Sequence, residues 1–317
     1  MTPRLVFAVA LVACAGPASQ AQQAPPAAPP PAAVAVLPVQ RAVSMLVTPG
    51  GNVAVQAGED GPLLVDAPAA AQAAAVVAAV RALSPKPIHT LITTNLHNAA
   101  GNAALLQARS APGTPAIRVI AHENVLDRLV AAGPAAGTAA GGLRLNQVIE
   151  LPINNTYFMP RRDFYQNGEA IVVYHAPAAH TDGDSIVHFR GSDVVAVGDL
   201  FNPDVYPVID VANGGSVNGL VAALNHILEI TVPAKFQEGG TYVIPRHGRL
   251  SDEAEVVEFR DMVTIVRDRV RDQIAKGRTL AQVKAARPTL DYDPEYGGTG
   301  DSSADRFVES VFRSLSK

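Results

Sequence analysis

Short apolar segments rich in β-branched residues alternate with helical segments along the chain, and this alternation occurs twice. Each half opens with strands joined by tight turns, such as Gly50-Gly51 and Asp60-Gly61, and continues as strand–helix units. Strands are predicted at residues 43–47, 52–56, 62–65, 90–93, 116–121, 170–174, 186–189, 194–197 and 242–244, and helices at 69–83, 103–109, 124–131, 217–230 and 252–275. This order favours an α/β (α+β) fold in which two mixed sheets pack between helices.

The N-terminus has the pattern of a targeting segment. Arg4, an apolar run over residues 5–15 and the small residues Ser19-Gln20-Ala21 predict a signal peptide over residues 1–21. Cys14 follows Leu11-Val12-Ala13, which is typical of a lipoprotein signal, although it is equally an ordinary signal residue. Both alternatives predict export, either to a bacterial periplasm or to a lipid anchor at Cys14 in the envelope.

A linker and one domain are expected to follow. Residues 22–38 are dominated by Ala and Pro, which favour an extended spacer over packed structure. The folded domain would then occupy residues 39–317 and end in a helical extension, with short helices from about Thr279 to Leu315.

Composition excludes several classes of protein. The 25 Lys+Arg and 29 Asp+Glu give a net charge of −4, which argues against nucleic-acid binding. The single cysteine excludes a disulfide framework and a Cys-rich zinc module. No apolar run approaches the roughly 20 residues of a membrane-spanning helix. The expected partner is a small-molecule substrate.

Three of the eight histidines lie just after predicted strands, namely His97, His180 and His247, and Asp199 follows a fourth strand. Loops at strand ends are where layered α/β proteins gather site residues. A lone loop histidine is more often a surface residue than a ligand. Three imidazoles and a carboxylate together, however, can hold zinc or iron.

The order of these segments resembles the metallo-β-lactamase superfamily. The resemblance extends over about residues 43–262 and also includes Leu63-Leu64-Val65-Asp66 and Gly101-Asn102. It implies a four-layer αββα sandwich with a metal site along one edge of the sheets. The segments that carry it are His180-Thr181-Asp182-Gly183-Asp184, Gly198-Asp199-Leu200-Phe201 and Ile244-Pro245-Arg246-His247-Gly248.

The resemblance also implies roles for single residues. His180 matches a ligand of the first metal, Asp199 the carboxylate that bridges two metals, and His247 a ligand of the second. Thr94-Asn95-Leu96-His97 stands where the family has Thr-His-x-His-x-Asp-His, so His97 matches its second histidine. Arg246 replaces the usual glycine; it would bind an anionic group in the cleft or point outward.

The first motif is degenerate. Asn95 replaces the first histidine, Ala99 and Ala100 replace the Asp and the last histidine, and the loop is two residues short. Asp199 and His247 alone are too few for a second metal, whereas His97, His180 and Asp199 leave a sensible site for one zinc. The lost Asp also removes the group that orients the attacking water.

Asp182 and Asp184 are the possible catalytic replacements for that Asp, although their nearer role is to hold the loop that presents His180. Tyr206 and Asp210 follow the Asp199 loop, where turn formation and packing are favoured over a place in a substrate pocket.

Three hypotheses follow. The preferred one is an exported zinc-dependent hydrolase that attacks an ester, amide or lactone with water. The alternative is a metal-poor pseudoenzyme that serves as a binding or envelope-associated module. A non-hydrolytic iron site is a third.

Overall fold

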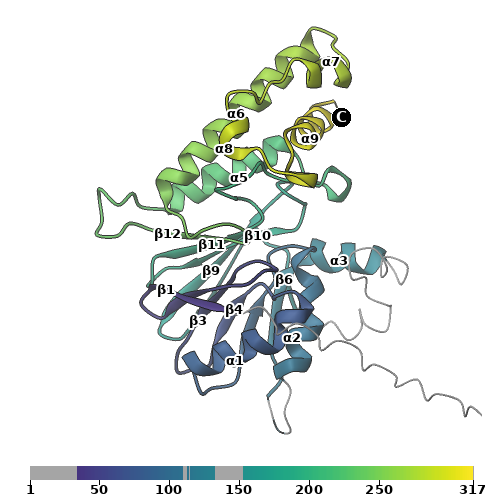
Figure 1. Cartoon of the computed structure of the whole chain (residues 1–317). Helices are drawn as coiled ribbons and strands as arrows, with labels where there is room; N and C mark the ends of the chain where they lie inside the picture. Colours follow the sequence, from purple (N-terminus) through teal and green to yellow (C-terminus); the bar gives the residue numbers. More distant parts are fainter. Residues whose placement is uncertain (1–33, 110–112, 114, 133–152, 317) are drawn as a thin grey trace, which may run out of the picture. The chain divides into compact units, whose positions relative to one another are not determined.

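Two β-sheets form the centre of the domain in the computed structural model, which describes residues 34–109, 113, 115–132 and 153–316 (Figure 1). Within these residues, the first sheet contains seven strands and the second contains five. In spatial order, the first sheet is β1 (Ala35–Gln40), β2 (Val43–Val47), β3 (Val53–Gln56), β4 (Leu63–Val65), β5 (Thr90–Ile92), β6 (Arg118–His122) and β7 (Asn155–Tyr157). The second is β12 (Tyr242–Pro245), β11 (Val194–Gly198), β10 (Asp184–Phe189), β9 (Glu169–Ala176) and β8 (Arg161–Gln166).

Both sheets are mixed, as predicted. Strands β1 to β4 pair antiparallel, and β4 to β7 pair parallel. In the second sheet only β11 and β12 pair parallel. The parallel pairs place several strand ends at one edge, where the predicted site residues follow.

Side chains alternate along the strands between three apolar layers. Ile92 and Ile120 of the first sheet and Val187 and Ile244 of the second belong to the layer between the sheets. Their sequence neighbours, such as Leu91 beside Ile92, face helices instead. This two-residue period explains why single strands contribute to two cores, and it produces the four-layer αββα sandwich that the sequence predicted.

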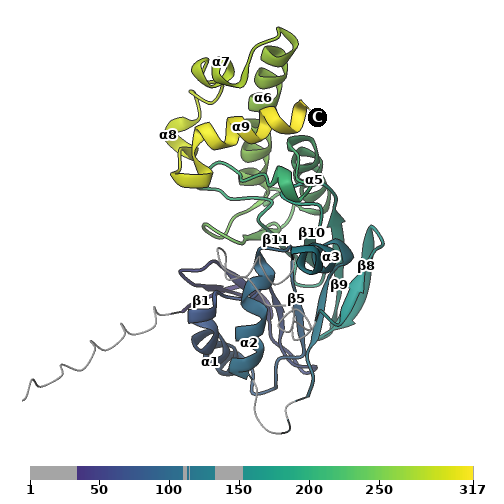
Figure 2. The same ribbon diagram turned by 90° about the vertical axis from the view of Figure 1, so that its right-hand side faces the viewer.

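Helices cover the outer face of each sheet (Figures 1 and 2). The first sheet packs against α1 (Ala73–Leu83), α2 (Asn102–Arg109) and α3 (Glu123–Ala132). The second packs against α5 (Val217–Ile230) and α6 (Glu253–Ala275). The hydroxyl of Ser216 accepts a hydrogen bond from the amide of Gly219 and caps α5, as expected.

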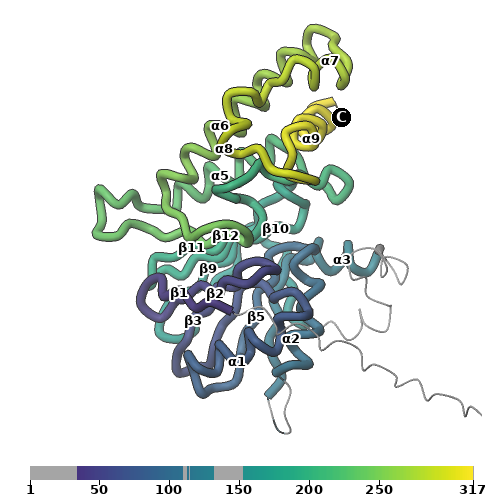
Figure 3. The backbone as a smooth tube through the Cα atoms, in the orientation of Figure 1, coloured from purple at the N-terminus to yellow at the C-terminus, as the bar shows by residue number. Residues whose placement is uncertain are grey.

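The C-terminal extension folds back onto these two helices (Figure 3). It consists of α7 (Leu280–Ala285), α8 (Asp293–Tyr296), the 3₁₀ turn η5 (Gly300–Ser302) and α9 (Ala304–Leu315). Phe307 and Val311 of α9 are buried in the same apolar layer as Val263 of α6. Within the described residues, no helix has the length and apolarity needed to span a bilayer.

Three strands were not predicted. β1 begins inside the segment expected to be a linker, so residues 35–38 belong to the first sheet. Proline is tolerated there because β1 is an edge strand. β7 and β8 are short or rich in charged residues, which hides them from an apolar pattern. The predicted signal peptide and Cys14 lie outside the described residues.

Candidate active site

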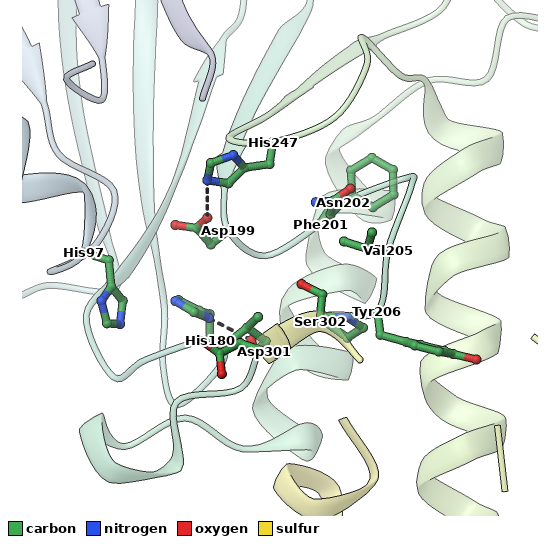
Figure 4. A pocket seen from close by; sticks show the side chains of 12 residues that line it. His97, His180, Asp199, Phe201, Asn202, Val205, Tyr206, His247, Asp301 and Ser302 are labelled. Atoms are coloured by element: carbon green, nitrogen blue, oxygen red, sulfur yellow. Dashed lines mark hydrogen bonds and ion pairs between the residues drawn. The ribbon is translucent and has the colours of Figure 1, made fainter. Parts of the chain in front are cut away.

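Four loops meet at one edge of the two sheets and line a cavity of about 450 Å³ (Figure 4). His97 follows β5, His180 lies between β9 and β10, Asp199 follows β11 directly, and His247 comes soon after β12. The structure therefore brings all four predicted metal ligands to the wall of one cavity. Their role as ligands stays a prediction.

The two sheets approach each other closely beside this cavity. Gly198 has a φ of +57°, and a Cβ atom there would lie 2.5 Å from the hydroxyl oxygen of Thr94. The same hydroxyl and the backbone amide of Thr94 donate to the buried carboxylate of Asp66. Burial raises the pKa of Asp66 to about 6, against the lowering effect of Arg246 and of the Thr94 donors.

The side chain of His180 is held by a backbone carbonyl. Its Nδ1 lies 2.8 Å from the carbonyl oxygen of Val208, and a carbonyl only accepts, so Nδ1 carries the hydrogen. In a neutral ring, Nε2 is then the nitrogen available to the cavity. The rings of His180 and His97 lie side by side, with centroids 5.2 Å apart.

His97 is fixed by a carboxylate. Its Nε2 lies 3.1 Å from Oδ2 of Asp210, and this hydrogen bond raises the pKa of His97 although burial opposes the shift. The pKa of Asp210 lies well below its usual value, chiefly because of the same hydrogen bond. Asp210 was predicted to shape its turn, which it does by accepting the amide of Asn213, but it also orients His97.

Asp199 is held by two side-chain amides. The Nδ2 atoms of Asn95 and Asn98 donate to Oδ2 at 2.8 and 2.9 Å. Burial alone would raise the pKa of Asp199, but His180, the Asn95 amide and nearby positive charges outweigh it and keep the pKa low. Asp199 is therefore ionised, with Oδ1 on the side of His247.

His247 is the most exposed of the four, with 53% of its side chain accessible. Its Nε2 lies 3.9 Å from Oδ1 of Asp199 (Figure 4). Burial of the ring lowers its pKa despite that carboxylate, so His247 is a neutral imidazole near pH 7.

The degenerate loop after β5 forms a hydrogen-bond network in place of a ligand cluster. Besides binding Asp199, Asn95 accepts the backbone amides of His97 and Asn98 through Oδ1. Asn98 donates to Asp66 and Thr94 as well. These contacts tie the loop to the second sheet through neutral amides.

Arg246 differs from both sequence-based alternatives. It is only 6% exposed and its guanidinium donates to protein oxygens, so it does not point outward. It is also not among the residues that line the 450 Å³ cavity. The guanidinium of Arg246 is therefore buried between the two sheets. Its place in the sequence beside His247 did not predict this burial.

The two possible catalytic carboxylates, Asp182 and Asp184, do not line the cavity. Asp182 pairs with Arg128 of α3 at 2.7 Å. Asp184 is buried, accepts the amide of Thr181, and has its pKa raised well above the usual value by burial. Both hold the His180 loop, so the prediction that either acts on substrate is not supported by their positions.

Apolar and polar residues share the rest of the cavity wall. Val205 and Val208 line it, and the backbone carbonyl of Val208 contacts His180. The ring of Tyr206 is buried and stacks on Phe307, and its hydroxyl donates to the carbonyl of Thr289. Asp301 and Ser302 of η5 complete the rim (Figure 4). Tyr206 borders the pocket, but its ring is packed in the apolar core, as expected.

The comparison with known families settles the relationship. The sequence profile described as "Metallo-beta-lactamase superfamily" matches residues 47–234, more than half of the chain. The chain belongs to the metallo-beta-lactamase superfamily. No curated protein sequence matches it closely enough to report.

Solved structures of the superfamily fold are similar at low identity. A stereoselective inverting sec-alkylsulfatase from Pseudomonas sp. matches with a TM-score of 0.63 and 14% identity, over 88% of this chain and 50% of its own. This chain thus spans half the length of that enzyme. Metallo-beta-lactamases from Pontibacter korlensis and Hirschia baltica match with TM-scores of 0.51 and 0.53 and identities of 14% and 16%, over 73% of this chain and 99% and 98% of theirs. At these identities the likeness shows the fold.

Superfamily membership raises the question of whether these residues fit a metal. Among the residues that the structure describes, no three His, Cys, Asp or Glu side chains converge tightly enough to surround an ion. The donor chemistry nevertheless suits one ion, because His97, His180 and Asp199 each have one atom fixed by the protein and one left for the cavity. A second ion does not fit, since only Asp199 and His247 remain for it.

Proposed function

We propose that the chain is an exported hydrolase that uses one zinc ion to cleave an ester, amide or lactone bond of a small molecule. His97, His180 and Asp199 would hold the ion, with His247 assisting. The orientation of His97 by Asp210 and of His180 by Val208 carries the proposal. Metal-binding histidines characteristically donate their second nitrogen to a carboxylate or carbonyl in this way.

A bound zinc ion supplies Lewis-acid polarisation of the scissile carbonyl and a water of lowered pKa. The residues of the chain supply position and proton transfer. Asp199 is held ionised by two amides, and the neutral imidazole of His247 lies beside it as a proton acceptor. Because Ala99 replaces the family's water-orienting Asp, we expect a rate about 10²–10⁴-fold below that of an enzyme with a positioned base.

The apolar residues that line the pocket favour a substrate with an apolar group. Val205 and Val208 line the cavity together with the histidines, so an alkyl or aryl group beside the scissile bond would contact them. Export of the mature domain and a possible anchor at Cys14 belong to this proposal and rest on the signal-like residues 1–21.

The pseudoenzyme alternative has its own support. The first loop satisfies its polar groups through amide hydrogen bonds, which a binding module without metal would need. Under that alternative the cavity binds a small molecule without cleaving it.

Zinc content and hydrolysis, measured together, separate the two. We expect about one zinc per chain and chelator-sensitive hydrolysis of aryl esters, both lost in His180→Ala. His226→Ala, which removes a histidine on α5 away from the cavity, should change neither. An absence of zinc after reconstitution, or hydrolysis indifferent to His180→Ala, would favour the binding module.

A further inference from the structure

Arg246 occupies a site built to hold a guanidinium group. Its Nε donates to Oδ1 of Asn98 at 3.1 Å, and its two terminal nitrogens donate to the carbonyl oxygens of Asn52, Gly50 and Ala67 at 2.6 to 2.9 Å. Gly51 has a φ of +109°, and a Cβ atom there would lie 2.9 Å from Cζ of Arg246. The backbone around Gly51 is thus shaped around this side chain.

The guanidinium controls which way the Asn98 amide faces. Because Oδ1 of Asn98 accepts from Arg246, Nδ2 must face the other side, where it donates to Oδ2 of both Asp199 and Asp66. If the amide were flipped, its oxygen would face two carboxylates and its NH₂ would face a guanidinium donor. Arg246 therefore fixes the donor that holds Asp199.

Arg246 lines a cavity beside the two residues that the superfamily resemblance assigns to a second metal. Arg246, Asn98 and Ala100 line a cavity of about 270 Å³ together with Asp199 and His247, the two remaining ligands of that metal. The carboxylates of Asp66 and Asp199 lie on the other side of the Asn98 amide. Within the described contacts, Arg246 reaches these carboxylates through Asn98 and forms no direct ion pair with them.

We infer that Arg246 is a positioning residue whose guanidinium serves as the second cation of the site. It orients Asn98, Asn98 holds Oδ2 of Asp199, and Oδ1 is the oxygen left for a single metal ion. This inference deepens the proposed function and rests on it for its metal-binding part, whereas the cation role of Arg246 stands without metal.

Chemical rescue tests the cation role. Arg246→Gly removes the side chain but leaves the cradle, which free guanidinium at 5–50 mM can enter. Urea, its neutral isostere, fills the same space without charge. We expect guanidinium, and not urea, to restore the Tm of the metal-free variant. Equal rescue by both, or by neither, would show that charge at this position is irrelevant.

Zinc affinity tests the positioning role, because a merely structural arginine would leave it unchanged in a folded variant. We expect Arg246→Met and Arg246→Lys to weaken zinc binding about 10–100-fold in competition with a chromophoric chelator, since neither offers the planar donor to Asn98. Arg249→Met, which removes an exposed neighbour paired with Asp204 and Glu255, should change it less than 2-fold. Unchanged affinity in Arg246→Met would overturn the inference.

Two results for the wild-type chain separate the inference from the proposed function. Two zinc ions per chain would overturn the inference and leave a zinc hydrolase intact. No zinc at all would remove the proposed function, and the rescue of Tm would then decide the cation role alone. Where Arg246→Gly fails to fold, guanidinium and urea are compared as additives during refolding, with the same expected difference.

Discussion

Four loops face the same cavity, namely the loop after β5 and the loops after β9, β11 and β12. The polar side chains of the first loop make different contacts from those of the later three. In the later loops, His180, Asp199 and His247 keep a donor atom on the cavity side. In the first loop, the side-chain amides of Asn95 and Asn98 are hydrogen-bonded to other protein groups. A loop can thus lose metal ligands and still be fixed, because amide hydrogen bonds replace the bonds to metal.

The largest expected effect on stability comes from removing Asn98, the centre of the amide network. Asn98→Ala leaves Nε of Arg246 and the buried carboxylates of Asp66 and Asp199 each short of a partner. Unpaired buried polar groups cost about 1–3 kcal/mol each, so we expect a loss of about 2–4 kcal/mol in the free energy of unfolding. Urea denaturation measures it.

Asn202→Ala is the matched control, because Asn202 lines the 450 Å³ cavity and, within the described residues, its side chain accepts a single hydrogen bond, from the amide of Asp204. It should cost less than about 1 kcal/mol. A similar loss in both variants would mean that the first loop is no more tightly bonded than the cavity rim.

The next largest effect is expected from Asn95→His, which restores the first histidine of the superfamily motif and tests whether the first loop can bind metal again. In Asn95→His, one imidazole acceptor cannot take both backbone amides that Oδ1 now accepts, and the ring is larger than the buried amide. We expect a loss of about 1–3 kcal/mol and no gain in zinc per chain. Unfolding and metal analysis of this variant, beside Asn202→His, measure both. A rise to two zinc ions with unchanged stability would show that the first loop can still hold a second metal.

Features that depend on neighbouring residues were predicted from the sequence, whereas contacts between residues far apart in the sequence were not. The order of strands and helices is a local signal, and it predicted two mixed sheets between helices. The histidines at strand ends, together with the resemblance to the superfamily, predicted the four layers and one site at the sheet edge. Pro38 hid the edge strand β1, because proline composition favours a linker over a strand. The charged strand β8 was hidden for a similar reason.

The network of the first loop was beyond sequence reasoning for a physical reason. Arg246 and Asn98 are 148 residues apart, and nothing near either shows that they meet. A buried arginine also contradicts the expectation from its chemistry, which favours exposure unless partners are supplied. The nearest signal was Arg246 in place of a glycine, which marked the position as unusual without showing which way the side chain points.

The pair His97–Asp210 joins the two regions and should depend on pH. The pKa of His97 is raised, so its contribution to stability is present below its usual pKa and is lost as pH rises through the raised value. The pKa of Asp210 is lowered, so its contribution is lost as pH falls below about 4. The pair therefore stabilises the metal-free chain most between about pH 4 and 6.5.

Asp210→Asn should remove this contribution. Because His97 is 45% exposed, solvent screening limits the loss to less than about 1 kcal/mol at pH 5.5, and it should shrink by pH 8. Unfolding measured at several pH values follows it. Glu229→Gln, which breaks the exposed pair with His226, is the control for removing a surface carboxylate. A loss equal at pH 5.5 and pH 8 would show that Asp210 acts only as the cap of its turn.

The smallest expected effect concerns the rim, where the C-terminal extension adds a third contributor to the cavity. Asp301 has 82% of its side chain exposed, and its nearest cation is Arg306 at 3.9 Å, so it leaves a negative charge beside the pocket. Asp301→Lys should raise kcat/KM for an anionic ester over its neutral counterpart by about 2–5-fold, because an exposed charge acts weakly and is screened. The gain should fall between 20 and 300 mM salt, and Asp305→Lys, the same change on α9 away from the cavity, should give none. Equal gains from both variants would assign the effect to net charge, and η5 would then be a wall of the pocket without influence on which substrate enters.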